Sequence, residues 1–214
     1  MILYKYRSLA RESSEFTLDI IHNCRLYCAP WHELNDPMEG MFEFFTNDER
    51  DAEYLDQVIM HKHGYRVCSL SRTKYSHVMW AHYADQSRGV MIAVDVQVPS
   101  ANLVDIYYRS SHSLSIRRNG ADTNNVARKI LSSKHKEWSY EKEVRILSDQ
   151  AFFNAAEIHH VTLGIRTSTS DENEVIRACR RREIPLYKLR LGDEGLEERP
   201  FDEYQRAQRR RERW

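Results

Sequence analysis

Two glutamates, one residue apart and directly before an apolar run, constrain the fold of this chain more than any other feature. Residues 138–147 read WSYEKEVRIL. Because side chains alternate faces along a strand, Glu141 and Glu143 would point the same way and repel each other. Either Lys142 and Arg145 balance them on a solvated edge, or the pair belongs to a functional site.

The pattern of apolar residues along the chain indicates an α+β protein. Apolar residues alternate in some of the expected strands, form a nearly continuous run over 88–96, and recur with helical spacing in the expected helices. We expect strands over residues 2–7, 25–30, 65–71, 88–96, 104–108, 138–147, 159–165 and 184–191, and helices over 13–23, 47–63, 75–85, 121–137 and 171–183. Since strands and helices do not alternate strictly, split antiparallel or mixed sheets flanked by helices are expected.

One folded domain is expected over residues 1–191, followed by a polar, basic tail over residues 192–214. A chain of 214 residues suffices for one substantial domain, and no repeat or low-complexity linker interrupts it. From Gly192 onward the composition turns polar, and the chain ends in QRAQRRRERW. Such a segment is expected to pack poorly.

Composition argues against several classes of protein. Lys and Arg together number 32, as do Asp and Glu, so the formal net charge is zero and supplies no bulk attraction to nucleic acid or membrane. No apolar run approaches the roughly 18 residues that a membrane span needs. The first residues lack a signal-peptide core, so a cytoplasmic protein is expected. The cysteines lack zinc-site spacing and are expected to be reduced, mostly buried thiols, with no metal site.

Three of the expected strands carry side chains that could form one site. The first strand ends in Tyr6 and Arg7, the third holds Ser69 and Ser71, and the late strand holds the two glutamates. Arginine binds phosphate through two parallel hydrogen bonds. A carboxylate stabilises the oxocarbenium-like centre of glycosidic cleavage. NAD meets both demands, because it has a pyrophosphate and an N-glycosidic bond to nicotinamide.

The loop over residues 31–40 is rich in acidic and aromatic side chains. Asn35 and Asp36 precede a proline there, which is a strong turn signal because Asn and Asp bond their own backbone and Pro fixes φ. The loop is either an ordinary connection or the lining of a pocket, since binding residues often lie on loops.

The helix over residues 75–85 is rich in aromatic side chains. It carries Trp80, His82 and Tyr83. These rings either pack in the core or line the site, where Trp80 or Tyr83 would stack on nicotinamide or adenine.

The order Tyr-Arg, then Ser-x-Ser, then Glu-x-Glu resembles the Arg-Ser-Glu class of mono-ADP-ribosyltransferases, the cholera-toxin-like group. The likeness is best over residues 140–144, YEKEV. Residues 3–190 are also similar to a widespread bacterial and phage family of unknown function, which shares the YKYRS, NDPxE, MWAHYA and W-x-Y-E-x-E-x-R motifs. Leu70 departs from the toxin pattern, which has Thr between the two serines, and the toxins lack the NDPxE loop and the aromatic helix.

The first resemblance implies an NAD-dependent mono-ADP-ribosyltransferase with the fold of that class. Arg7 would contact the NAD phosphates or the nicotinamide ribose, and Ser69 would hold Glu143 in place by a hydrogen bond. Glu143 would bond the ribose 2′-hydroxyl and stabilise the oxocarbenium centre as nicotinamide leaves. Glu141 would orient or deprotonate the macromolecular acceptor, a protein or a nucleic acid. The implied NAD-binding residues are Tyr6, Arg7, Asn35, Asp36, Ser69, Ser71, Trp80, His82 and Tyr83.

Two other interpretations stay open. The same site could pass ADP-ribose to water, or act as a hydrolase on another glycosidic or nucleotide substrate. Alternatively the protein is a binding module for nucleic acid or protein, in which the glutamates are structural. Arginines over residues 177–182 and 206–213 favour an anionic partner but equally fit a solvated helix face and a frayed tail. The transferase interpretation requires Arg7, Ser69 and Glu143 to face one cleft.

Overall fold

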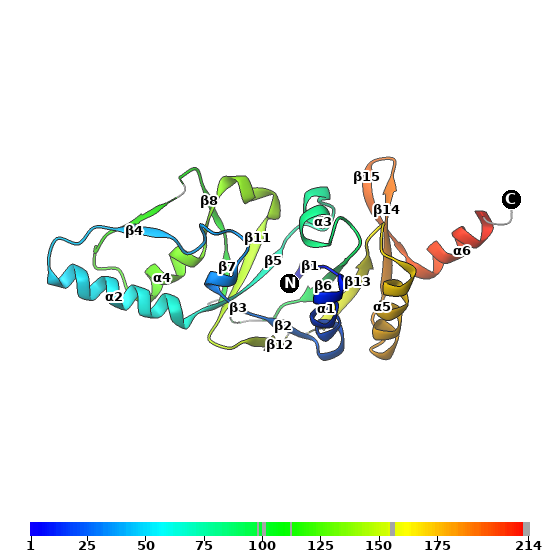
Figure 1. Cartoon of the computed structure of the whole chain (residues 1–214), viewed down its shortest axis with the longest axis horizontal. Helices are drawn as coiled ribbons and strands as arrows, with labels where there is room; N and C mark the ends of the chain where they lie inside the picture. Colours follow the sequence, from blue (N-terminus) through cyan, green and yellow to red (C-terminus); the bar gives the residue numbers. More distant parts are fainter. Residues whose placement is uncertain (98, 100–101, 112, 155–156, 212–214) are drawn as a thin grey trace. The chain divides into compact units, whose positions relative to one another are not determined.

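The computed structural model describes residues 1–97, 99, 102–111, 113–154 and 157–211 (Figure 1). Helices and open, mixed sheets follow one another without strict alternation, which confirms the expected α+β class. The chain forms two compact units, each assembled from segments that are distant in sequence. The first unit comprises Met1–Leu26, Leu70–Gln97 and Asn154–Trp214, and the second comprises Tyr27–Ser69 and Val98–Phe153.

A mixed sheet forms the centre of the first unit. Its strands, in order across the sheet, are β15 (Gly195–Pro200), β14 (Leu186–Gly192), β13 (Glu157–Leu163), β6 (Val90–Asp95) and β1 (Ile2–Arg7). β13 and β14 run parallel, and the other neighbours are antiparallel. β6 is buried along most of its length, as its continuous apolar sequence predicts.

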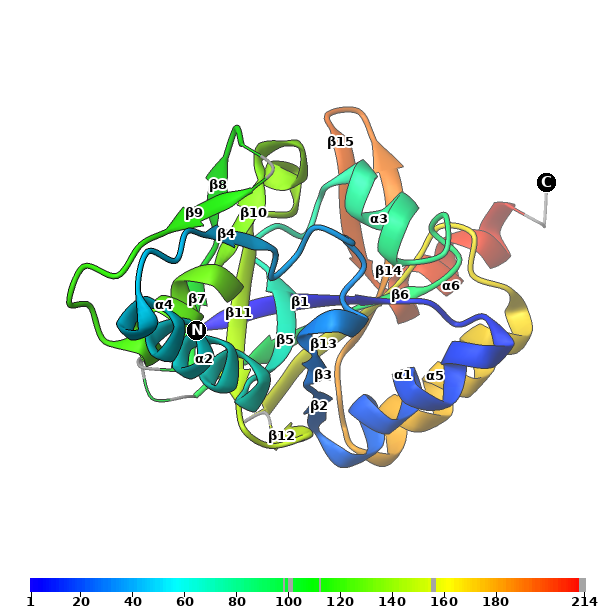
Figure 2. The same cartoon turned by 60° about the vertical axis from the view of Figure 1, so that its left-hand side comes forward.

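Helices cover this sheet on both faces. They are α1 (Arg11–Asn23), α3 (His77–Tyr83), α5 (Thr169–Arg181) and α6 (Phe201–Arg211). α1 contacts α5, α3 packs on β1, and α6 packs on β14 and β15. Figure 2 shows α3 on the opposite side of the β1 and β6 strands from α1 and α5.

A glycine at position 89 allows the close approach of chain segments at the end of β1. A Cβ atom placed on Gly89 would lie 2.1 Å from the carbonyl oxygen of Arg7. No side chain fits in that space, so Gly89 lets Arg7 pair with Val90 in the β1–β6 ladder.

Residues 192–211 form a strand and a helix, where composition predicted a poorly packed tail. β15 pairs with β14 along its whole length, and Phe201 at the start of α6 is buried. The charged residues of β15 misled the prediction because they form ion pairs within the unit, Glu197 with Arg190 and Glu198 with Lys74.

The second unit combines two helices with several small sheets. Helices α2 (Glu49–Gly64) and α4 (Thr123–Leu131) pack against each other. Val58, Ile116, Val126 and Ile130 form the core between them. The remaining elements are β3 (Ala29–Pro30), η1 (Trp31–Glu33), β4 (Phe42–Phe44), β7 (Leu103–Asp105), β8 (Tyr107–Arg109), β9 (Leu114–Ile116), β10 (Ser133–His135), η3 (Lys136–Glu141) and β11 (Glu143–Ser148), where η marks a 3₁₀ helix.

The strands of the second unit pair with one another over short stretches. β11 lies next to β5 (Arg66–Ser71) and pairs with β7 on its other side. β3 pairs with β5, while β10 with β8 and β4 with β9 form small parallel sheets. The division between the units falls within β5 and also within β2 (Arg25–Tyr27) and β12 (Phe152–Asn154).

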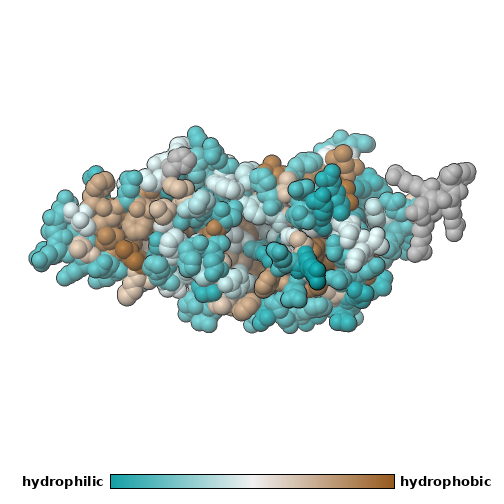
Figure 3. All heavy atoms as spheres, in the orientation of Figure 1, coloured by the Kyte–Doolittle hydropathy of each residue, from teal (hydrophilic) through white to brown (hydrophobic). Residues whose placement is uncertain are grey.

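Apolar side chains gather over β4 on the face of the second unit drawn in Figure 3. Met41 and Phe45 flank that strand and are 49% and 61% exposed. In the described part of the chain, no helix is long and apolar enough to cross a membrane.

Candidate functional site

Both glutamates of the WSYEKEVRIL stretch are buried in the second unit, although the strand expected to carry them begins only at Glu143. Glu141 is the last residue of η3, and Lys142 takes a left-handed conformation with φ 44°. The period-two argument is therefore wrong for Glu141. The turn at Lys142 nevertheless brings both carboxylates to one cation, since Lys134 Nζ lies 2.7 Å from Glu141 and 3.3 Å from Glu143.

Five charged side chains meet at this point and are named here the buried charge cluster. Its members are Glu39, Lys134, Glu141, Glu143 and Arg145, and each side chain is at most 4% exposed. Lys134 contacts all three carboxylates, with Glu39 Oε1 at 2.9 Å. The cluster is thus one connected network with three acids and two bases.

Arg145 holds Glu143 through two hydrogen bonds. Its Nε donates to Oε1 of Glu143 at 2.7 Å, and its Nη2 donates to Oε2 at 3.0 Å. It also pairs with Glu39 and donates to the carbonyl of Leu131 at 2.6 Å. Lys142, the other counter-charge expected from the sequence, is exposed, and the buried Lys134 takes its place.

Two hydroxyl groups complete the surroundings of Glu143. A hydrogen bond from Ser69 helps to lower the pKa of the Glu143 carboxyl group, and the resemblance implies such a contact. The hydroxyl oxygen of Tyr108 accepts the backbone N–H of Glu143 at 2.8 Å. Burial raises the pKa of Tyr108 to about 12, so its hydroxyl stays protonated at neutral pH.

The electrostatics of the buried charge cluster keep Glu143 ionised. Burial opposes its ionisation, but the charges of Arg145 and Lys134 and the hydrogen bonds from Arg145 and Ser69 outweigh burial and lower its pKa to about 2. Burial likewise opposes the charged forms of Lys134 and Arg145, yet the surrounding carboxylates raise the pKa of both. Both cations therefore stay charged at neutral pH.

The loop with the NDPxE motif delivers Glu39 to the cluster. The carboxylate of Asp36 accepts the backbone N–H of Met38 at 2.9 Å, and its carbonyl accepts the N–H of Glu39 at 3.0 Å. Asp36 is buried and forms the turn itself, whereas Asn35 is exposed. The turn therefore accounts for Asp36 structurally, and the NAD-binding role of both residues stays a prediction.

A buried lysine fixes the backbone beside Glu39. Lys62 Nζ donates to the carbonyl of Gly40 at 3.0 Å and lies 3.8 Å from the ring centre of Trp31. Burial lowers the pKa of Lys62. Gly40 has φ +70°, and a Cβ atom there would lie 2.7 Å from the Trp31 ring. Lys62 and Trp31 thus hold the loop where Glu39 reaches Arg145.

Partly exposed aromatic rings border the cluster. Lys134 Nζ lies 4.8 Å from the ring centre of Trp138, a cation–π contact. The rings of Trp138 and Tyr140 are 6.1 Å apart. Trp138 lies beside the cluster and is partly exposed.

Several predicted NAD-binding residues belong to the first unit, where their polar atoms bond within that unit. Tyr6 donates to the carbonyl of Thr73 at 2.9 Å, and Ser71 Oγ accepts the Thr73 N–H at 3.0 Å. Trp80 is 1% exposed, donates to the carbonyl of Lys74 and meets the Tyr6 ring edge-on at 5.4 Å. Tyr6 and Trp80 are thus packed in the core of the first unit.

His82 and Tyr83 are more accessible than Trp80. Their rings contact each other at 6.3 Å; His82 is exposed and Tyr83 is half-buried. Arg7 lies at the end of β1, also in the first unit. The roles of Arg7, His82 and Tyr83 toward NAD, and the single cleft expected for Arg7, Ser69 and Glu143, stay predictions.

Three members of the cluster were missing from the sequence-based site: Glu39, Lys134 and Arg145. Arg145 was expected only as a counter-charge on a solvated edge, although it lies two residues after Glu143 on one strand face. Glu39 belongs to the NDPxE motif, which marked its loop but not its role. Lys134 had no signal, since the helix over 121–137 was expected to continue through it. Among the residues that the structure describes, no His, Cys, Asp and Glu side chains gather in threes to hold a metal ion.

Comparison with known proteins found one family model that matches part of this chain. Residues 79–146 match the family described as "Protein of unknown function (DUF2971)". The match covers less than half of the chain and includes Lys134, Glu141, Glu143 and Arg145. It agrees with the resemblance to a family of unknown function. Neither the curated proteins nor the solved structures gave a match.

Proposed function

We propose that the protein is an NAD-dependent mono-ADP-ribosyltransferase that modifies a macromolecular acceptor, with Glu143 as its catalytic carboxylate. The observation that carries this proposal is the hydrogen bond from Ser69 to an ionised Glu143. This pairing is the one that the Arg-Ser-Glu resemblance implies, and it joins two residues that are 74 positions apart in the sequence.

The charge balance of the buried charge cluster suits the chemistry. Three carboxylates share two cations, so the cluster carries one acid in excess and favours a positive charge beside it. As the bond between the ribose carbon and nicotinamide breaks, nicotinamide leaves with the electron pair and the ribose becomes positive. Glu143 would stabilise that charge, and a buried setting strengthens the interaction.

The second glutamate would serve the acceptor. After nicotinamide leaves, a nucleophilic atom of the acceptor bonds to the ribose carbon and loses a proton. Glu141 would orient that atom and accept the proton, and the partly exposed ring of Trp138 would contact the acceptor. NAD supplies the ADP-ribose and no further reactant is needed.

A second candidate function, a binding module with structural glutamates, is favoured by one observation. Arg145 and Lys134 together engage both carboxylate oxygens of Glu143. A network so connected stabilises the fold of the second unit whether or not it performs chemistry. A hydrolase that passes ADP-ribose to water would use the same residues as the transferase.

The test is incubation of labelled NAD with a cell extract and either the wild-type protein or Glu143→Gln. We expect the variant to lose label transfer by about 10²–10³-fold, the typical effect of removing one group that stabilises developing charge. It should stay folded, because removing one acid leaves two carboxylates facing two cations. Glu198→Gln is a matched control, since Glu198 is also a glutamate with a pKa of about 2 but lies in the first unit.

The outcomes separate the candidates. Label on a protein or nucleic acid with the wild type and with Glu198→Gln, but not with Glu143→Gln, supports the transferase. Nicotinamide release without labelling identifies the hydrolase. If neither occurs with folded protein, the transferase proposal fails, and salt-dependent binding of RNA or DNA would then test the binding module.

A further inference from the structure

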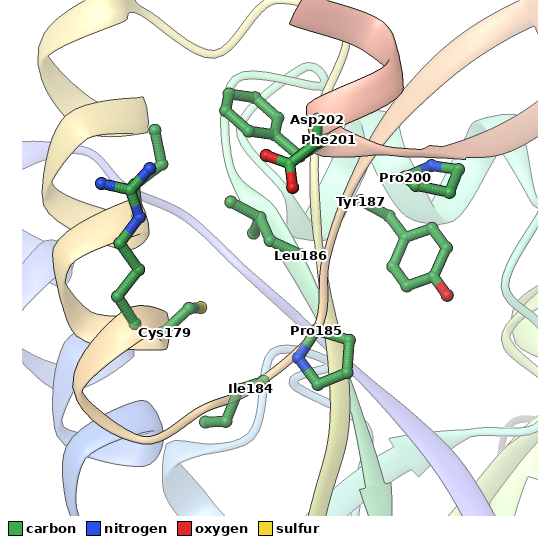
Figure 4. Close-up of a pocket in the computed structure, with 10 residues that line it drawn as sticks. Cys179, Ile184, Pro185, Leu186, Tyr187, Pro200, Phe201 and Asp202 are labelled. Atoms are coloured by element: carbon green, nitrogen blue, oxygen red, sulfur yellow. The ribbon is translucent and has the colours of Figure 1, made fainter.

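A pocket of about 330 Å³ lies in the first unit between α5, the start of β14 and the start of α6. Figure 4 shows Leu186 and Phe201 between the helix and the strands, with the Asp202 carboxylate beside them. Ten residues line the pocket: Ile176, Cys179, Arg180, Ile184, Pro185, Leu186, Tyr187, Pro200, Phe201 and Asp202. None of them was assigned to the proposed transferase site.

Apolar side chains supply about half of this lining, and polar atoms supply the rest. Ile176, Ile184, Leu186 and Phe201 supply aliphatic and aromatic surface from three different elements. Burial raises the pKa of the Cys179 thiol to about 12, so the thiol is neutral at physiological pH and acts as apolar lining rather than as a nucleophile. The pocket therefore offers apolar surface to one part of a ligand and polar groups to another part.

Two charges of opposite sign complete the lining. Arg180 lies in the last turn of α5, and Asp202 lies in the first turn of α6. Both residues are exposed. Arginine recognises a carboxylate through two hydrogen bonds, and aspartate recognises an ammonium group.

We propose that this pocket binds a small zwitterion with an apolar side chain, the chemistry of a free amino acid such as leucine or phenylalanine. Arg180 holds the carboxylate, Asp202 holds the ammonium group, and Leu186 and Phe201 cover the side chain. The volume lies at the lower end of the range for small-molecule pockets, about 300–1,000 Å³, which suits an amino acid better than a dinucleotide. This inference is independent of the proposed transferase activity.

Calorimetric titration of the full chain tests the proposal. The ligands are leucine and phenylalanine, with 3-phenylpropionate and phenethylamine as analogues that each lack one charge. We expect saturable binding of at least one amino acid, and binding of each analogue that is weaker by roughly tenfold or more, since each loses a charged hydrogen-bond pair.

Variants at the two charges separate this site from surface binding. Arg180→Gln and Asp202→Asn are expected to raise the dissociation constant of the bound amino acid by roughly tenfold each. Arg181→Gln is the matched control, because Arg181 is exposed on the same turn of α5 and does not line the pocket. The proposal is overturned if neither leucine nor phenylalanine binds at millimolar concentration. It is also overturned if Arg180→Gln and Arg181→Gln have the same dissociation constant for the bound amino acid.

Discussion

Each unit of this protein contains a glutamate with a mostly covered side chain and a pKa lowered to about 2, and the two are held in different ways. In the first unit, Glu198 accepts hydrogen bonds from Thr162 at 2.6 Å and Lys74 at 3.1 Å, and His160 lies 3.5 Å away. Burial opposes its ionisation, and these neighbours outweigh that penalty. In the second unit, Glu143 shares its cations with two further carboxylates.

The difference lies in the balance of charge. Around Glu198 a single carboxylate is served by several donors, and its cation Lys74 is 32% exposed. In the buried charge cluster three carboxylates compete for two cations that are each 1% exposed. A strongly lowered glutamate pKa therefore accompanies ion pairing in both units, whereas the excess of acidic over basic side chains is found in the buried charge cluster.

The largest expected difference in stability comes from removing the cation that pairs with the glutamate in each unit. Arg145→Leu leaves buried carboxylates without their main partner and should lower the free energy of unfolding by about 3–5 kcal/mol. Lys74→Met removes a partly exposed partner, and the loss should be about 1 kcal/mol or less. Urea unfolding of both variants measures the difference, and equal losses would contradict the contrast drawn here.

Both glutamates should contribute to the pH dependence of the free energy of unfolding. The pKa of Glu143 and of Glu198 falls from 4.5 to about 2 on folding, so between these values the unfolded state binds more protons than the folded state. The stabilisation is complete above pH 4.5 and is lost as the pH falls toward 2. Glu143→Gln and Glu198→Gln should each reduce the number of protons taken up on unfolding by about one. The slope of unfolding free energy against pH falls accordingly. An unchanged slope in either variant would show that the glutamate is not ionised as described.

The smallest expected difference in stability between the units concerns the two hydroxyl groups. Ser69→Ala and Thr162→Val each remove one hydrogen bond to a buried glutamate, and each should cost about 1–3 kcal/mol of stability. Only Ser69→Ala should also lower label transfer from NAD, because Ser69 orients the proposed catalytic carboxylate. Parallel unfolding and transfer assays measure both quantities, and equal transfer by the two variants would assign Ser69 a purely structural role.

Sequence reasoning succeeded where a pattern is local. The strand over 2–7 follows from apolar periodicity, and the buried strand β6 follows from a continuous apolar run. The contact between Ser69 and Glu143 was implied by the resemblance and not by a local pattern. The cluster as a whole was out of reach for a physical reason. Arg145 and Glu39 are 106 residues apart, and no local pattern encodes such a contact.

Lys134 shows a second limit. Its segment was expected to be helical, but α4 ends at Leu131 because two serines follow it. Ser132 and Ser133 both donate their hydroxyls to the carbonyl of Lys129, at 3.3 and 2.8 Å. Serine competes with the backbone in this way and disfavours helix continuation. The chain then forms β10, which places Lys134 in the buried charge cluster.

The interleaved segments of the two units have a consequence for how this protein can change by recombination. The chain passes from one unit to the other between residues 26 and 27, 69 and 70, 97 and 98, and 153 and 154. No single cut yields an intact unit, so neither unit can be expressed as one contiguous fragment or exchanged as a cassette between genes. The two units are inherited together.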